Sequence, residues 1–519
     1  MLFDTSNALN FPLLSLIVFL PLAGAALVAI LPKRHPGLLY ATGIFTSGLV
    51  LVLSILLFAD FDRGWSGPVD VRAAFQFADP PIGGGLSAAA TWLPGGITYQ
   101  LGVDGISLTL VLLTCLLSFI ALLFSMQRVG ERVREYVALM LLLETGMLGV
   151  FCAMDLFLFY VFWEASLIPM YFLIGIWGGQ RRIYASLKFV IYTMAGSALM
   201  LVAILALAQL SGAGSFHLFD LLQADLLPEG TQMLLFAAFA LAFAVKVPLF
   251  PFHTWLPDAH VQAPTAGSVI LAGVLLKLGS YGLLRFAIPL FPTAARAAVP
   301  VFFGLAIIGV WYGAWVAFAQ TDIKKLVAYS SVSHMGIVVV GLFALNAQGV
   351  AGGTLQMINH GLSTGALFLL VGMLYERAHS RQIADFGGLW KTMPRFSAIF
   401  LIVMFSSVGL PGTNGFVGEW LSLLGAFRAN MLTGALATFG VVLGAAYMLW
   451  AYQRVFFGPT SALSAKMTDI GGLELAMLVP LVVLIFWIGV YPDTFLGPIQ
   501  EASTAWVKLI NSAVAVAVR

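Results

Sequence analysis

The sequence predicts an all-α protein that crosses a membrane about fourteen times. Three observations lead to this fold class. Of the 519 residues, 61% are hydrophobic and only 9% are charged, whereas soluble domains carry about 25% charged residues. The chain divides into about fourteen apolar runs, each close to the roughly 20 residues that a helix needs to cross a bilayer core. Basic residues gather in alternate loops between these runs, as they do in polytopic membrane proteins.

The predicted spans follow one another with short connections, except for one long connection, residues 59–105, which is rich in Pro, Gly and Asp. We expect that connection to be an external cap and not a second domain. In chain order the predicted spans are residues 11–31, 38–58, 106–126, 134–153, 155–178, 184–210, 232–250, 265–288, 298–320, 324–345, 351–375, 396–427, 431–456 and 473–496.

The distribution of Lys and Arg predicts the orientation. Fifteen of the 25 basic residues fall in one set of alternate loops, so the positive-inside rule places those loops in the cytoplasm and both termini on the opposite side. The opposite side holds seven basic residues: Arg63, Arg72, Arg285, Arg296, Arg428, Lys508 and Arg519. The formal net charge of +2 gives no reason to expect a nucleic-acid partner.

Ionisable residues also occur inside the apolar runs. A charge at the bilayer centre costs about 2.5 to 3.5 kcal/mol even on the mildest scale, so each must face protein or water. One alternative is a set of static clamps, for example between Glu164 and Lys246. Both signs of charge and two histidines, without metal-ligand clustering, favour a chain of proton carriers. The eight residues are Glu144, Glu164, Lys188, Lys246, Lys277, His334, His360 and Glu419.

Two of the runs contain a helix break beside a charge. In "AVKVPLFPFHTWLPDAH" (residues 244–260), three prolines follow Lys246, and in "SSVGLPGTNGFVGEW" (residues 406–420), Pro411 and Gly412 precede Glu419. Proline removes a backbone donor and frees a carbonyl, and irregular backbone is tolerated in a membrane only where it is buried in protein or lines water. Discontinuous helices in corresponding places of two halves are typical of ion-transport sites.

Polar neighbours extend three of these positions along a helix face. Gln356, His360 and Ser363 are spaced at i, i+4 and i+7, which places them on one face. Ser330 lies one turn before His334, and Ser280 and Tyr281 follow Lys277. These stripes predict hydrated paths along the helices.

The sequence predicts no cofactor in this chain. Cys115 and Cys152, the only two cysteines, lie inside apolar runs and cannot supply the four thiolates that an iron–sulfur cluster normally takes. No Gly-rich dinucleotide fingerprint or flavin motif occurs. The energy for transport is therefore expected to come from partner subunits.

Four segments closely resemble the antiporter-like M subunits of bacterial respiratory complex I, the counterparts of mitochondrial subunit four. They are "FWEASLIPMYFLIGIWG" (162–178), the segment 244–285, "AQTDIKKLVAYSSVSHMG" (319–336) and "GLPGTNGFVGEW" (409–420). The resemblance covers runs four to thirteen. It implies fourteen helices with two inverted five-helix repeats, helices 4–8 and 9–13, and broken helices 7 and 12. The implied division of the chain is 1–130, 131–290, 291–456 and 457–519.

Carried over residue by residue, the resemblance implies a proton relay. Glu164 matches the acid on helix 5 that pairs with the broken-helix Lys246. The central lysine of helix 8 is matched by Lys277. The two bridging histidines and the terminal acid on helix 12 are matched by His334, His360 and Glu419. Glu144 and Lys188 have weaker claims to a place in the relay, and we expect them to be structural or accessory.

Two function classes are compatible with these residues. The first is a proton-translocating, non-redox subunit of NADH:quinone oxidoreductase in the bacterial inner membrane. The second is a subunit of a multisubunit Na⁺/H⁺ antiporter. Glu419 favours the first, because the related antiporters and sister subunits usually have lysine there. The first class implies NADH, FMN, iron–sulfur clusters and quinone in partner subunits, and contacts with lipid, other membrane subunits and sister antiporter-like subunits. A purely structural scaffold would leave the buried ionisable residues unexplained.

Overall fold

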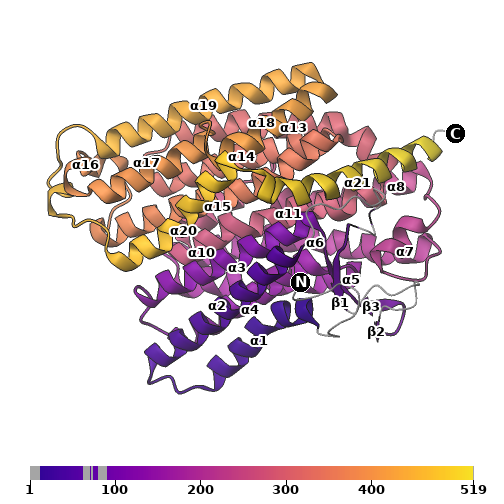
Figure 1. Ribbon diagram of the computed structural model, residues 1–519, viewed down its shortest axis with the longest axis horizontal. Helices are drawn as coiled ribbons and strands as arrows, with labels where there is room; N and C mark the ends of the chain where they lie inside the picture. Colours follow the sequence, from indigo (N-terminus) through magenta and orange to yellow (C-terminus); the bar gives the residue numbers. More distant parts are fainter. Residues whose placement is uncertain (1–11, 62–70, 72–73, 80–89, 518–519) are drawn as a thin grey trace.

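The computed structural model describes residues 12–61, 71, 74–79 and 90–517, and within them it is a helical bundle with two short strand pairs. Thirteen helices of this part are long and apolar enough to cross a membrane, and most run side by side along the long axis of the molecule (Figure 1). The predicted twelfth span is divided into two shorter helices. With this divided span added, the thirteen helices correspond to the fourteen predicted spans.

The first half of the bundle starts with six helices: α1 (Leu13–Ile30), α2 (Pro36–Asp60), α3 (Gly105–Met126), α4 (Val133–Cys152), α5 (Leu156–Trp177) and α6 (Arg182–Leu210). The short α7 (Leu218–Gln223) precedes the broken seventh span, which consists of α8 (Glu229–Lys246) and α9 (Trp255–Gln262). The prediction extended this span to residue 250. The helix ends at Lys246 because prolines at 248 and 251 cannot donate to the preceding turn.

The eighth span, residues Thr265–Leu290, is one continuous rod that changes its winding twice. Two π-helical turns, η1 (Leu271–Leu275) and η2 (Leu283–Ala287), lie on either side of α11 (Leu276–Gly282). The rod begins with α10 (Thr265–Ile270) and ends with α12 (Ile288–Leu290). π-helical turns are rare and occur mostly at functional sites, and here they enclose the segment that carries Lys277.

The second half continues with α13 (Pro292–Phe318), α14 (Ile323–Phe343), α15 (Ala347–Ala378), the 3₁₀ turn η3 (Ile383–Asp385) and α16 (Leu389–Thr392). The broken twelfth span is α17 (Pro394–Val408) followed by α18 (Asn414–Ala429). The last elements are α19 (Met431–Phe456), the 3₁₀ turn η4 (Ser464–Lys466), α20 (Gly472–Val490) and α21 (Asp493–Ala517). The helix α21 lies in the predicted C-terminal tail, beyond the fourteen predicted spans.

Burial divides the helices into an enclosed centre and an apolar periphery. The most apolar stretches of Thr265–Leu290 and α15 are fully buried, and that of α14 is 94% buried, against 33% for α20. The enclosed helices carry Lys277, His334 and His360. Their polar side chains therefore face protein and not lipid, as the cost of intramembrane charge requires.

The connection before α3 contains two antiparallel strand pairs. Strand β1 (Phe77–Asp79) pairs with β4 (Leu101–Val103), and β2 (Ala90–Leu93) pairs with β3 (Ile97–Tyr99). Thr98 donates hydrogen bonds from its N–H and its hydroxyl to Asp155, which caps α5, and so joins β3 to the bundle. Arg63, Arg72 and Arg519 lie outside the described residues.

One basic residue counted on the non-cytoplasmic side is enclosed by protein. Arg285, near the end of the predicted span 265–288, lies inside η2 and is 2% exposed. Its charge is neutralised by Asp104, whose Oδ1 lies 2.6 Å from Nη2 of Arg285. Because the two residues are 181 positions apart, hydropathy along the chain does not reveal that the arginine has a buried partner.

Candidate functional site

The break after α8 leaves Lys246 at the end of a buried helix. Trp255, the first residue of α9, donates from Nε1 to the carbonyl of Val245 at 2.9 Å, and Leu249 N donates to the carbonyl of Ala244. These bonds satisfy carbonyls that the prolines would otherwise leave free. The break is therefore built into the protein interior and places a lysine at its edge.

The Lys246 side chain is buried without a hydrogen-bond partner. Its Nζ is buried and makes no hydrogen bond in the described part of the chain. It lies 5.2 Å from the ring centroid of Trp163 and 5.5 Å from that of Phe189. Oε1 of Glu164 also lacks a partner there. No hydrogen bond therefore joins Lys246 to Glu164 in the described residues.

Lys277 and His360 are in direct contact at the centre of the bundle. Lys277 Nζ lies 2.7 Å from Nδ1 of His360 and also donates to the carbonyl of Ala272 in the π-helical turn before it. Both side chains are buried. Nε2 of His360 has no hydrogen-bond partner among the described residues, so one ring nitrogen is bonded and the other is free to accept or give a proton.

His334 and Glu419 form the next contact in the same direction. The two imidazole rings of His334 and His360 have centroids 6.0 Å apart. Nδ1 of His334 lies 3.0 Å from Oε1 of Glu419, and Gln356 donates from Nε2 to the same oxygen at 3.1 Å. Lys277, His360, His334 and Glu419 thereby form a continuous line of titratable groups from α11 across α15 and α14 to α18.

The break between α17 and α18 shapes the surroundings of Glu419. Gly409 has φ of +80°, a conformation that glycine adopts at no steric cost. A Cβ at this position would lie 2.7 Å from Oε2 of Glu419. Asn359 donates to the carbonyl of Asn414 at 2.7 Å, which ties α15 to the first residue of α18. The open backbone at Gly409 therefore makes room for the carboxylate.

Two histidines beyond the six predicted residues lie in the first break. His260 on α9 is fully buried, stacks on Phe368 with ring centroids 4.5 Å apart, and has no hydrogen-bond partner on either ring nitrogen among the described residues. His253 stacks on Phe250 with centroids 5.6 Å apart. The available signal is their position within the proline-rich break. Ring nitrogens that are unpartnered within the described residues distinguish them from hydrogen-bonded core histidines, and this feature is visible only in the folded chain.

Glu144 and Lys188 have partners away from the central line. Ser47 donates to Oε1 of Glu144 at 3.0 Å, and Lys188 Nζ lies 2.7 Å from Oδ2 of Asp258 on α9. The Lys188 pair bridges α6 and the broken span. No group of three His, Cys, Asp or Glu side chains in the described ranges is close enough to hold a metal ion.

A cavity of about 430 Å³ opens at the end of the bundle where the loops are most basic. It is lined by residues from α3, α9, α10, α14 and the loops around them, among them Arg128, Gln262, Thr265, Lys324 and Arg381. Lys324 donates to the carbonyl of Ala263, directly after α9. The cavity therefore brings a polar opening next to the broken seventh span.

Comparison with known proteins identifies similar chains. Residues 153–444 match the model of the family described as NADH:quinone oxidoreductase/Mrp antiporter, transmembrane. The chain is 47% identical over 499 residues to NADH-quinone oxidoreductase subunit M of Rhodobacter capsulatus, an alignment that covers 93% of each chain. The matched family region includes all six predicted site residues.

Two solved structures share the fold. A chain of respiratory complex I from Thermus thermophilus is 37% identical, with a TM-score of 0.85 over 96% of this chain and 99% of that chain. A chain of the Mrp complex from Dietzia sp. DQ12-45-1b has a TM-score of 0.81 over 97% of this chain and 100% of that one. At 19% identity, the second likeness concerns the fold alone.

Proposed function

Because the chain belongs to the family of NADH:quinone oxidoreductase and Mrp antiporter membrane subunits, we propose that it translocates protons as subunit M of a NADH:quinone oxidoreductase. One observation carries the proposal. Lys277, His360, His334 and Glu419 form an enclosed line across the four helices α11, α15, α14 and α18. The similarity to subunit M of Rhodobacter capsulatus along 93% of the chain favours the same assembly.

The first step of the proposed mechanism is an electrostatic switch at the first break. A buried ammonium without an anionic partner is unfavourable. When Glu164 moves close, Lys246 holds its proton. When Glu164 moves away, Lys246 loses its anionic partner and the proton leaves toward Lys277. His260 and His253 supply imidazoles near this route.

The second step passes the proton along the central line. Lys277 gives a proton to Nδ1 of His360, with which it is in contact. The free Nε2 of His360 then gives its proton toward the ring of His334. His334 is hydrogen bonded to Glu419, which releases the proton at the second break. Each transfer moves a proton between two groups that are within hydrogen-bond reach or are bridged by one water molecule.

The energy and the redox chemistry belong to partner subunits in this proposal. We infer that NADH, FMN, iron–sulfur clusters and quinone are bound there, and that other membrane subunits, including sister antiporter-like subunits, transmit the switch to Glu164. The basic cavity lies on the cytoplasmic side by the positive-inside rule. Both termini then lie on the periplasmic side of a bacterial inner membrane. The two halves form inverted five-helix repeats in this proposal, with the two breaks in corresponding places.

The experiment compares assembled complexes in proteoliposomes. We expect Lys277→Ala and His334→Gln each to lower NADH-driven, quinone-linked proton uptake by about tenfold or more, since a positioned proton-transfer group contributes about 10²- to 10⁴-fold. The matched control is Lys325→Ala, which removes an exposed lysine and leaves proton uptake unchanged. Wild-type uptake in both relay variants would refute the proposal.

The alternative function, a Na⁺/H⁺ antiporter subunit, rests on the family description, which names NADH:quinone oxidoreductase and Mrp antiporter together. The same vesicles distinguish it. An imposed sodium gradient without NADH should drive no proton movement if the chain works in an oxidoreductase. Sodium-driven proton movement that disappears in Lys277→Ala would support the antiporter.

A further inference from the structure

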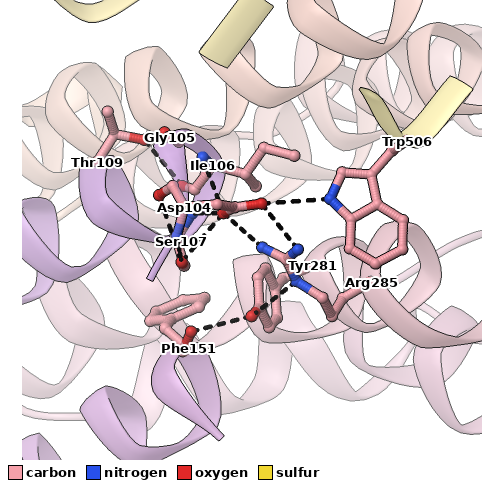
Figure 2. Close-up of polar contacts among 9 residues, drawn as sticks. All are labelled: Asp104, Gly105, Ile106, Ser107, Thr109, Phe151, Tyr281, Arg285 and Trp506. Atoms are coloured by element: carbon pink, nitrogen blue, oxygen red, sulfur yellow. Dashed lines mark hydrogen bonds and ion pairs between the residues drawn. The ribbon is translucent and has the colours of Figure 1, made fainter. Parts of the chain in front are cut away.

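A second buried charge cluster lies at the far end of the helix that carries Lys277 (Figure 2). Arg285 and Asp104 make two parallel bonds, Nη1 to Oδ2 at 2.8 Å and Nη2 to Oδ1 at 2.6 Å. Their exposed fractions are 2% and 0%. A planar guanidinium that binds a carboxylate with two bonds fixes orientation as well as charge.

Aromatic rings enclose the guanidinium. The Arg285 Cζ atom lies 4.9 Å from the ring centroids of both Phe75 and Trp506, and 5.1 Å from that of Tyr281. Nε1 of Trp506 donates to Oδ2 of Asp104 at 3.2 Å. Arg285 also donates from Nε to the Tyr281 hydroxyl, which in turn donates to the carbonyl of Phe151 on α4. Figure 2 shows the guanidinium of Arg285 and the indole of Trp506 meeting at the carboxylate of Asp104.

The cluster joins three elements that are far apart in the sequence. Asp104 caps α3 by accepting from the N–H groups of Ile106 and Ser107. Trp506 belongs to α21, and Arg285 belongs to η2. Tyr281 stands one helical turn after Lys277, on the same helix face. Through Trp506, the cluster therefore connects the C-terminal helix to the segment that presents Lys277.

The C-terminal helix also contacts the helix of His360. α21 packs against α15 and α3, and it approaches α3 so closely that a Cβ on Gly105 would overlap the carbonyl of Pro498. The outer parts of the Lys277 rod and of α15 are thus held by the same helix. Because π-helical turns lie on both sides of α11, its position depends on such external contacts and not on regular helix winding alone.

Stability alone does not account for this arrangement. Replacing a buried ion pair by apolar residues of similar volume is often neutral or stabilising. A carboxylate with a bidentate arginine, an indole donor and two backbone donors instead selects one relative placement of the three elements.

We propose that Asp104, Arg285 and Trp506 are positioning residues, which lock α21, α3 and the Lys277 rod in one register and thereby keep Lys277 within reach of His360. The inference rests on the proposed relay through Lys277. It adds residues that lie outside the line of relay groups, and it gives the C-terminal helix a role in transport.

Two variants that retain the charge balance test this inference. Trp506→Phe removes the indole donor, and Arg285→Lys keeps the positive charge but loses the fork. In assembled complexes we expect each to lower kcat for quinone-linked proton uptake by roughly threefold to tenfold, with KM for NADH and quinone unchanged, since displacing a reacting group by about 1 Å can cost about 10²-fold. The matched control is Trp487→Phe, which removes the same donor from Thr494.

The outcomes separate the possibilities. Wild-type kcat per assembled complex in both variants would overturn the inference. This holds even if less complex is assembled, because the cluster would then stabilise the fold without affecting transport. The neutral pair Asp104→Asn with Arg285→Gln adds a check, since it restores charge balance without the fork and should keep the low kcat. Lys277→Ala is measured in parallel. If it pumps normally, the proposed relay itself fails, whereas loss in Lys277→Ala with normal kcat in both Trp506→Phe and Arg285→Lys overturns only the positioning role.

Discussion

Lys277 Nζ lies 2.7 Å from Nδ1 of His360, although the two residues are 83 positions apart in the chain. The contact joins the eighth span to α15 at the centre of the bundle, where both helices are enclosed by protein. A lysine and an imidazole at this distance cannot both carry a full charge without cost. The Lys277–His360 pair therefore carries one positive charge more readily than two.

Arginine at position 277 is expected to stop transport. The guanidinium keeps its charge at any accessible pH, so Lys277→Arg preserves a fixed positive charge but removes the exchangeable proton. We expect quinone-linked proton uptake in proteoliposomes to fall nearly as far as in Lys277→Ala, in complexes that assemble normally. Near-wild-type uptake by the arginine variant would make Lys277 a static charge.

Glutamine at position 164 distinguishes a switch from a clamp. Oε1 of Glu164 and Nζ of Lys246 make no hydrogen bond in the described residues, so removing the carboxylate breaks no ion pair in this state. We expect Glu164→Gln to assemble normally on native gels and to depress coupled activity strongly. Failure to assemble would instead indicate a structural pair, because breaking a buried pair costs about 3 to 5 kcal/mol.

An alanine at position 409 is expected to displace Glu419. Its Cβ would lie 2.7 Å from Oε2 of Glu419, in a backbone conformation with φ of +80°. The matched control is Gly412→Ala, where φ is +91° and nothing lies within 4 Å of the added Cβ. Both variants carry similar backbone strain, about 1 to 2 kcal/mol. We expect both variants to lower the melting temperature by a similar amount, but only Gly409→Ala to lower proton uptake. An equal loss of proton uptake in the two variants would mean that backbone strain alone is responsible.

The ion pair of Asp104 gives a prediction about pH. Asp104 precedes the membrane-spanning part of α3. Burial acts to raise its pKa, but the charge and hydrogen bonds of Arg285, with those of Ser107 and Trp506, hold the pKa below its usual value. A carboxyl group with a lowered folded-state pKa stabilises the fold fully above its unfolded pKa of about 4, and this contribution is lost as the pH falls through the folded value.

We therefore expect Asp104→Asn to lower the melting temperature of the purified complex by the same amount throughout about pH 5 to 8. The destabilisation should approach the roughly 3 to 5 kcal/mol of a broken buried pair. Glu135→Gln, which breaks the exposed pair with Lys33, is the control and should cost about 0 to 1 kcal/mol. A difference that changes steadily between pH 5 and 8 would mean that Asp104 titrates there and is not held ionised by Arg285.

The sequence alone determined the class of fold, the number of spans and the place of both helix breaks. Hydropathy reports the burial of a whole helix, and proline acts on its own backbone, so both signals are local. Lys246, Lys277 and Glu419 also stood out locally, because a charge in an apolar run is costly wherever the helix packs.

The tertiary structure decided which of these charges touch. The contact of Lys277 with His360 and that of His334 with Glu419 depend on the packing of separate helices, and nothing along one helix specifies the distance between two. Arg285 shows the same limit, because only folding brings Asp104 and Trp506 to it. The burial of a charged side chain and the identity of its partner depend on residues from distant positions in the sequence. The physical reason is that electrostatic and hydrogen-bond energies act over short distances in space and not along the chain.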